Sequence, residues 1–315
     1  MDKRAWLGGL CGIMTGIFWG FSGVCGQFLF ETRGITSEWL VPIRLSVSGI
    51  IMFGYLFLTK REELFALARN RRDFLRTIVC GVCGTMMFQY TFLKAVQTSN
   101  AGTATVIQYM APVFIMIYTC VRKKKMPNGK EVIAIILAVG GIFLISTHGN
   151  LNNLVITPRG LFWGLACAFA MFISSILPGK LYEKYSTQVV MGWGFVFAGI
   201  VLSSFLQPWK YDVAIDMQTI GAVSVIILLG SVAAYGLYAI MVKQIGPTKA
   251  SLFVTSEAVA ATVISALWLK TVFYPIDLIG FVMILSTVFI LTLGKEPKEE
   301  RLFRRNKGKR LISVN

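Results

Sequence analysis

Long runs of apolar residues, separated by short polar stretches, follow one another along the chain. An α-helix needs about 20 apolar residues to cross the hydrocarbon core of a membrane, and ten of the runs reach about that length. The runs are continuous rather than alternating, which excludes a β-barrel. The first run is too long for a signal-peptide core and lacks a small-residue cleavage site, so it is expected to be a true helix. The ten helices are predicted at approximately 5–30, 38–58, 74–94, 100–121, 130–147, 159–179, 188–207, 219–242, 249–269 and 275–294.

The composition agrees with this pattern. Of the 315 residues, 55% are hydrophobic and only 15% are charged. A water-soluble globular domain of this size carries more charge, so the chain is predicted to be an all-α integral membrane protein. The ten runs occupy about two-thirds of the chain and leave no room for a soluble domain.

The net charge of +16 is explained by the concentration of Lys and Arg on one side of the membrane. With the N-terminus inside, 24 or 25 of the Lys and Arg residues fall on the cytoplasmic side and 5 on the outer side. The positive-inside rule then predicts that both termini are cytoplasmic. The basic side suits contact with anionic lipid head groups, and nucleic acid is not expected as a partner.

The second half of the chain repeats the first. A shift of 146 positions lays 80–96 over 226–242 and places Gly84 on Gly230 and Thr85 on Ser231. A repeat of five helices must enter the membrane from the opposite side in its second copy, which predicts an inverted pair of the kind that alternating-access carriers use. The expected organisation is a first five-helix repeat at 1–147, an outer linker at 148–158, a second, inverted repeat at 159–294 and a basic cytoplasmic tail at 295–315.

Several short motifs occur in the order found in one known family. They are "GIFWG" in the first helix, "PIRLSVSG" in the second, "YTFLKAV" in the third, "AGTATVIQYMAPVF" in the fourth and "TKAS" followed by Glu257 in the ninth. The chain resembles the EamA branch of the drug/metabolite transporter superfamily over residues 5–294. The resemblance implies a carrier of amino acids, other metabolites or toxic organic compounds. One departure is Glu257-Ala258, where relatives commonly have Glu-Pro.

Polar and aromatic residues that recur in both halves are the best candidates for a substrate cavity. Thr85, Gln89 and Phe92 share one helical face, as do Thr105, Tyr109 and Pro112. A structural alternative stays open, because Ser and Thr also bond to backbone in membrane helices and Tyr often lies at interfaces. The substrate-binding candidates are Trp19, Thr85, Gln89, Phe92, Thr105, Gln108, Tyr109, Ser231, Tyr235, Tyr238, Ser251, Thr255 and Glu257.

Glu257 is a carboxylate deep within the ninth apolar run. A charge at such depth is costly unless it is paired, hydrated or neutralised. Three roles are open: binding a cationic group of the substrate, proton coupling, or a structural partnership with another polar residue. Thr255 lies about 200° from Glu257 around the helix, so only one of the two is expected to face the cavity.

Arg44 is the only basic residue well inside a predicted span. It is expected about 9 Å from the level of Glu257, so it is predicted to extend outward to the membrane surface or to pack between helices. Gly12, Gly16 and Gly20 form a smooth strip for close helix packing, which could also let one bundle rock on another. Pro112 is expected to kink its helix, either for gating or for shape.

The predicted function is secondary active transport. No metal-ligand cluster, nucleophile pair or cofactor motif is present, so neither an enzyme nor a cofactor is expected. Besides Arg44, only Lys94 could offer the interior a fixed cation, which disfavours phosphate-bearing substrates. The expectation is a prokaryotic inner-membrane exporter of small zwitterionic, cationic or aromatic metabolites, monomeric or dimeric, in contact with lipids and with protons as a candidate coupling ion. The alternatives are an uptake permease, and a channel or a non-transporting scaffold.

Overall fold

The computed structural model describes residues 3–148 and 155–293. Over these residues it confirms ten apolar helical segments long enough to span a membrane. The basic tail predicted at 295–315 and most of the predicted linker lie outside the described residues. The spans are Trp6–Arg33, Ser37–Thr59, Arg71–Thr98, Ala101–Lys123, Gly129–Thr147, Pro158–Tyr182, Thr187–Leu206, Met217–Ile245, Lys249–Trp268 and Pro275–Thr292.

Several of these spans consist of more than one helix, because the helical hydrogen bonding is interrupted inside the membrane. The elements are α1 (Lys3–Arg33), α2 (Ser37–Thr59), α3 (Arg61–Arg69), α4 (Arg71–Val79), the π-helix η1 (Cys80–Met86), α5 (Met87–Thr98), α6 (Ala101–Gln108), α7 (Ala111–Lys123), α8 (Gly129–Thr147), α9 (Pro158–Ile176), α10 (Gly179–Tyr182), α11 (Thr187–Leu206), the 3₁₀-helix η2 (Pro208–Lys210), α12 (Met217–Ile227), the π-helix η3 (Leu228–Ala233), α13 (Ala234–Ile245), α14 (Pro247–Val254), α15 (Ser256–Trp268) and α16 (Pro275–Leu293).

Polar residues at the span ends set where the helices begin. Asn100 accepts a hydrogen bond from the backbone N–H of Thr103 at the start of α6, and Asp216 accepts one from Thr219 at the start of α12. Asn128 and Glu131 form a reciprocal capping box at the start of α8. Each cap satisfies a backbone donor that the first helical turn would leave free, so the turns between spans can be short.

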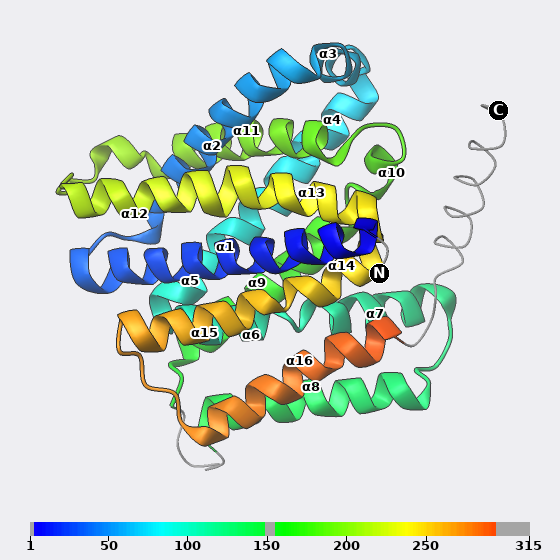
Figure 1. Cartoon of the computed structure of the whole chain (residues 1–315), viewed down its shortest axis with the longest axis vertical. Helices are drawn as coiled ribbons and strands as arrows, with labels where there is room; N and C mark the ends of the chain where they lie inside the picture. Colours follow the sequence, from blue (N-terminus) through cyan, green and yellow to red (C-terminus); the bar gives the residue numbers. More distant parts are fainter. Residues whose placement is uncertain (1–2, 149–154, 294–315) are drawn as a thin grey trace.

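The spans lie side by side in one bundle (Figure 1). α2 packs along α11 at one edge, and α8 packs along α16 at the opposite edge. Between these edges α1 packs against α13 and α15, while α9 packs against α5 and α6. The side on which α1 begins, at the right of Figure 1, is called the amino-terminal side below.

The interruptions occur at matching positions in the two halves. When the first half of the chain is aligned with the second at a shift of 146 residues, the π-helix η1 at Cys80–Met86 coincides in most of its length with the π-helix η3 at Leu228–Ala233. The break between α6 and α7 includes Tyr109, and the break between α14 and α15 falls at Thr255, which is the equivalent position. π-Helical segments and breaks of this kind are frequent at functional sites.

The glycines of α1 allow it to lie directly against α15. A Cβ atom at Gly16 would lie 2.8 Å from the backbone nitrogen of Glu257, and one at Gly20 would lie 2.8 Å from the backbone oxygen of Glu257. At Gly12, an added Cβ would lie 2.6 Å from the Cβ of Phe253 in the preceding helix α14. The strip therefore positions α15, and with it the Glu257 side chain, against α1.

Candidate functional site

A cavity of ≈ 540 Å³ lies inside the bundle. Helices from both halves of the chain contribute to its wall. It extends from the middle of the bundle toward the amino-terminal side, where Tyr182, Thr187 and Val242 lie close to the ends of their spans. A volume of this size accommodates a small metabolite.

Ten of the thirteen predicted substrate-binding residues line this cavity. Arg44 and Pro112 also lie in its wall, with Pro112 in the first turn of α7 just after the break at Tyr109. The ten are Trp19, Thr85, Gln89, Phe92, Gln108, Tyr109, Tyr235, Tyr238, Ser251 and Glu257.

The structure places the other three predicted residues away from the cavity wall. Thr105 is fully buried, and its hydroxyl has no hydrogen-bond partner within the described part of the chain. Thr255 donates to the backbone carbonyl of Leu252 at 2.6 Å, inside its own helix break. Ser231 is fully buried behind Arg44. The assignment of these residues to the cavity was wrong because the breaks in the helices change the helical phase that a regular α-helix would give.

Aromatic rings form one side of the cavity. Trp19 contacts Tyr235 edge-on, with ring centroids 5.2 Å apart, and Tyr238 at 5.7 Å. Phe195 meets Tyr235 from the other side at 5.3 Å. The side-chain amide of Gln89 donates to the Tyr235 hydroxyl at 3.3 Å. These contacts fix the Tyr235 ring, so that a flat apolar group can stack in the cavity without first ordering the wall.

The carboxylate of Glu257 lies in the cavity wall and is only 6% exposed. Oε1 accepts a hydrogen bond from Gln108 Nε2 at 3.1 Å, and Oε2 lies 3.4 Å from the Tyr109 hydroxyl. The same hydroxyl donates a shorter hydrogen bond, of 2.8 Å, to the backbone carbonyl of Val254, so its interaction with Oε2 is the weaker of the two. Among the described residues, no ion pair involves Glu257. The carboxylate is therefore held by neutral donors.

Arg44 points into the bundle rather than outward. The residue is 3% exposed, its Nε donates to Ser231 Oγ at 3.1 Å, and its Nη2 donates to the Gly230 carbonyl at 3.4 Å. The predicted outward extension was wrong, and the alternative of helix packing describes the observed contacts. The reason is local: η3 is a π-helix, whose irregular hydrogen bonding leaves polar groups that a guanidinium can bond.

Other cavity residues were not identified from the sequence. Phe88 is three positions after Thr85, so extending the predicted face by one residue would have found it. Phe195, Met171 and Ser174 lie on spans where no repeated polar pattern marks one face. They reach the cavity because α9 and α11 pack against η1.

Comparisons with known proteins agree with this architecture. The model of the EamA-like transporter family matches residues 6–147 and again residues 158–293. The chain is 32% identical to the uncharacterized inner membrane transporter YicL of Salmonella typhimurium, over 89% of this chain and 93% of the relative. It is 24% identical to a WAT1-related protein of Arabidopsis thaliana, over 84% of this chain and 79% of that protein. A crystal structure with 14% identity matches at a TM-score of 0.62, over 91% of this chain and 96% of the other, which shows a shared fold. The chain, whose described residues contain ten helical segments long enough to span a membrane, thus belongs to the EamA-like transporter family and is a membrane transporter.

Proposed function

We propose that this protein is a secondary active transporter that exports small zwitterionic, cationic or aromatic metabolites, such as amino acids or related compounds. The observation that carries the proposal is the Glu257 carboxylate, which faces the cavity and forms no ion pair within 4.0 Å among the described residues, with Arg44 of the same wall interacting with it only at longer range. A buried carboxylate without a direct ion pair is costly, and a substrate ammonium group or a proton would offset that cost.

The remaining cavity wall supports the same substrate class. Trp19, Tyr235 and Tyr238 offer ring faces for stacking and for cation–π contact, while Gln89 and Gln108 offer amide groups for hydrogen bonds. Among the residues that the structure describes, Arg44 is the only Lys or Arg in the wall of the cavity, and it already bonds Ser231 and Gly230. Phosphate-bearing substrates would require several free cations, so they fit this cavity poorly.

The arrangement of the helices favours alternating access between two inverted repeats, at 1–147 and 159–294. Gln89 and Tyr235 are equivalent residues and touch each other, and the pairs α2 with α11 and α8 with α16 are equivalent spans that pack together. Contacts between equivalent elements are expected along a pseudo-two-fold axis. The positions of Lys and Arg favour a cytoplasmic amino-terminal side, with both termini inside. The cavity would then open to the cytoplasm, from which an exporter takes its substrate.

The name of the Salmonella typhimurium relative supports a location in the inner membrane of a prokaryotic cell. There the protein would contact anionic head groups through its basic loops, as a monomer or a homodimer, with protons as the candidate coupling ion. Uptake is the alternative direction. A channel or a scaffold fits less well, because the family to which the chain belongs consists of transporters.

The proposal is tested by metabolite profiling of medium and cytosol. Cells that overproduce the wild type are compared with cells producing Tyr235→Ala and with cells carrying an empty vector. A compound enriched outside only with the wild type would identify the substrate and establish export. A compound depleted outside and gained inside would establish uptake and contradict the proposed direction. Saturable exchange of the same compound in liposomes would separate a carrier from a channel.

A further inference from the structure

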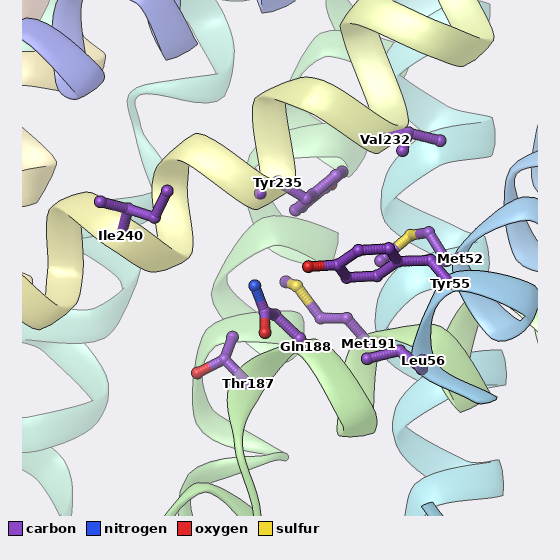
Figure 2. A pocket seen from close by; sticks show the side chains of 10 residues that line it. Met52, Tyr55, Leu56, Thr187, Gln188, Met191, Val232, Tyr235 and Ile240 are labelled. Carbon is purple, nitrogen blue, oxygen red and sulfur yellow. The ribbon is translucent and has the colours of Figure 1, made fainter. Parts of the chain in front are cut away.

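A second, smaller pocket of ≈ 190 Å³ lies between α2, α11 and the span that contains η3 and α13 (Figure 2). In Figure 2, Met52, Tyr55 and Leu56 extend from α2, and Val232, Tyr235 and Ile240 lie on the facing span. The start of α11 contributes Thr187, Gln188 and Met191 to the wall of the pocket, and α13 also contributes Gly236.

This pocket adjoins the central cavity. Thr187, Met191 and Tyr235 line both spaces, so the two share part of their wall. Thr187 and Met191 are short or flexible, and methionine adapts to differently shaped apolar neighbours. Met191 is therefore an adaptable part of the wall that the two spaces share.

The pocket also reaches the outer surface of the bundle within the membrane-spanning region. Two of its residues are exposed on that surface: Tyr55 is 57% exposed and Ile240 is 42% exposed. Tyr55 is four residues from the end of α2 and Ile240 is five residues from the end of α13, which places both about 6–8 Å inside the ends of their helices. The opening therefore faces the bilayer close to its boundary on the amino-terminal side.

The lining is polar at one end and apolar at the other. Thr187 and Gln188 are the first two residues of α11 and lie at the boundary. Met52 lies about 10 Å inside the end of α2, and Val232 lies deeper still. An occupant with a polar group at the boundary and an apolar group farther in matches this order.

We propose that the pocket is a lateral access site, through which an amphipathic substrate with an aromatic or short alkyl group passes between the adjacent leaflet and the central cavity. The inference rests on the proposed function and adds a route from the membrane. A cavity of about 150 Å³ holds one benzene ring, so a pocket of ≈ 190 Å³ suits a single ring and is small for a long acyl chain. The shared wall with the Tyr235-lined cavity favours the transported compound over a resident lipid.

Gly236→Leu provides a test, because the new side chain would fill the pocket. A Cβ atom at Gly236 would meet no atom within 4 Å, so the backbone at this position has room for a side chain that extends into the pocket. The matched control is Gly221→Leu, at an exposed position in α12 of the same span with equally open space. Both substitutions replace glycine in a helix, so they affect helix propensity alike.

The probe is an aryl diazirine that carries a primary amine, added to vesicles of phosphatidylethanolamine and phosphatidylglycerol containing the protein. After illumination, labelled peptides are mapped by mass spectrometry. The wild type and Gly221→Leu are expected to be labelled at the pocket and at the central cavity. In Gly236→Leu, labelling at both places is expected to fall about five-fold or more.

Other outcomes separate the two proposals. Equal labelling of the central cavity in all three proteins would overturn the lateral route and leave the proposed substrate class intact. Labelling of the pocket but not of the cavity in the wild type would overturn both. A phospholipid with a diazirine at the end of its acyl chain is tested in parallel. If that lipid labels the pocket and the amine does not, the occupant is a lipid chain and the route is overturned.

Discussion

Gln89 and Tyr235, which the predicted 146-residue register places at equivalent positions, are hydrogen bonded to each other in the wall of the central cavity, with Nε2 and the hydroxyl 3.3 Å apart. In a pair of inverted repeats, equivalent residues can touch only near the axis that relates the halves. The contact therefore marks the centre of the proposed repeat and couples the third span to the eighth. Tyr235 also lines the smaller pocket, so one ring borders both spaces.

Two substitutions at Tyr235 distinguish the contribution of its aromatic ring to transport from the contribution of its hydroxyl. Tyr235→Phe keeps the contacts with Trp19 and Phe195 but loses the hydrogen bond to Gln89, so we expect a loss of about 0.5–1.5 kcal/mol in the free energy of unfolding and transport within about three-fold of the wild type. Tyr235→Ala removes the ring and is expected to lower transport at least ten-fold. Efflux from preloaded liposomes measures both, and equal transport by Tyr235→Ala would contradict the cavity assignment.

Glu257→Gln tests the charge of the carboxylate. Glutamine is nearly isosteric and its carbonyl can still accept a hydrogen bond from Gln108, so we expect the protein to fold with unchanged or higher thermal stability. Transport of an amine substrate is expected to fall at least ten-fold at every pH. Glu62→Gln, at an exposed position of α3, is the matched control and should transport normally. Wild-type transport by Glu257→Gln at all pH values would make the carboxylate structural.

Arg44→Met tests the guanidinium that joins α2 to η3. The substitution removes the donors to Ser231 and to the Gly230 carbonyl, and hydrogen bonds to charged groups contribute about 1.5–3 kcal/mol each. We expect a loss of that order in the free energy of unfolding in detergent. Arg69→Met, at an exposed position of α3, should change stability by less than about 0.5 kcal/mol. Equal stability of the two variants would show that the contacts of Arg44 are not stabilising.

Alanine at two glycines should have opposite effects. At Gly16 the added Cβ would clash with the Glu257 backbone, so Gly16→Ala is expected to destabilise the protein by about 1–3 kcal/mol. At Gly54 in α2 an added Cβ meets nothing within 4 Å, and Gly54→Ala should stabilise the helix by about 0.5–1 kcal/mol. Thermal unfolding in one detergent compares the two. A stabilising Gly16→Ala would contradict the close packing of α1 on α15.

The sequence predicted the ten spans well, because membrane thickness alone fixes the length of an apolar run. It predicted most of the cavity wall, since repetition identified faces such as that of Gln89 and Tyr235. It failed at Thr105 and Thr255, where breaks in the helices alter the helical phase, and at Arg44, whose partners lie in a π-helix. The pocket beside Tyr55 could not be predicted, because it arises from the packing of three spans that no local pattern relates.

The far side of the bundle, opposite the amino-terminal side, is held by an ion pair between the two halves. Arg33 in the last turn of α1 lies 2.7 Å from Asp216, which caps α12. The backbone N–H of Thr219, together with the nearby Arg33, holds the pKa of Asp216 below its ordinary value. A carboxyl group with a lowered pKa stabilises the folded state when it is ionised, so its contribution is present above about pH 4 and is lost as the pH falls through the folded value.

Asp216→Asn removes the ion pair but keeps the helix cap, because asparagine and aspartate cap helices about equally well. Asp216→Ala removes both the ion pair and the cap. The two variants therefore separate the contribution of the ion pair to stability from that of the cap. At pH 7 the melting temperature is expected to decrease in the order wild type, Asp216→Asn, Asp216→Ala. Acidification below the lowered folded pKa of Asp216 should remove the difference between the wild type and Asp216→Asn, since both side chains are then neutral. A difference that does not depend on pH as the pH falls from about 5 to about 2 would mean that the charge of Asp216 is not its cause.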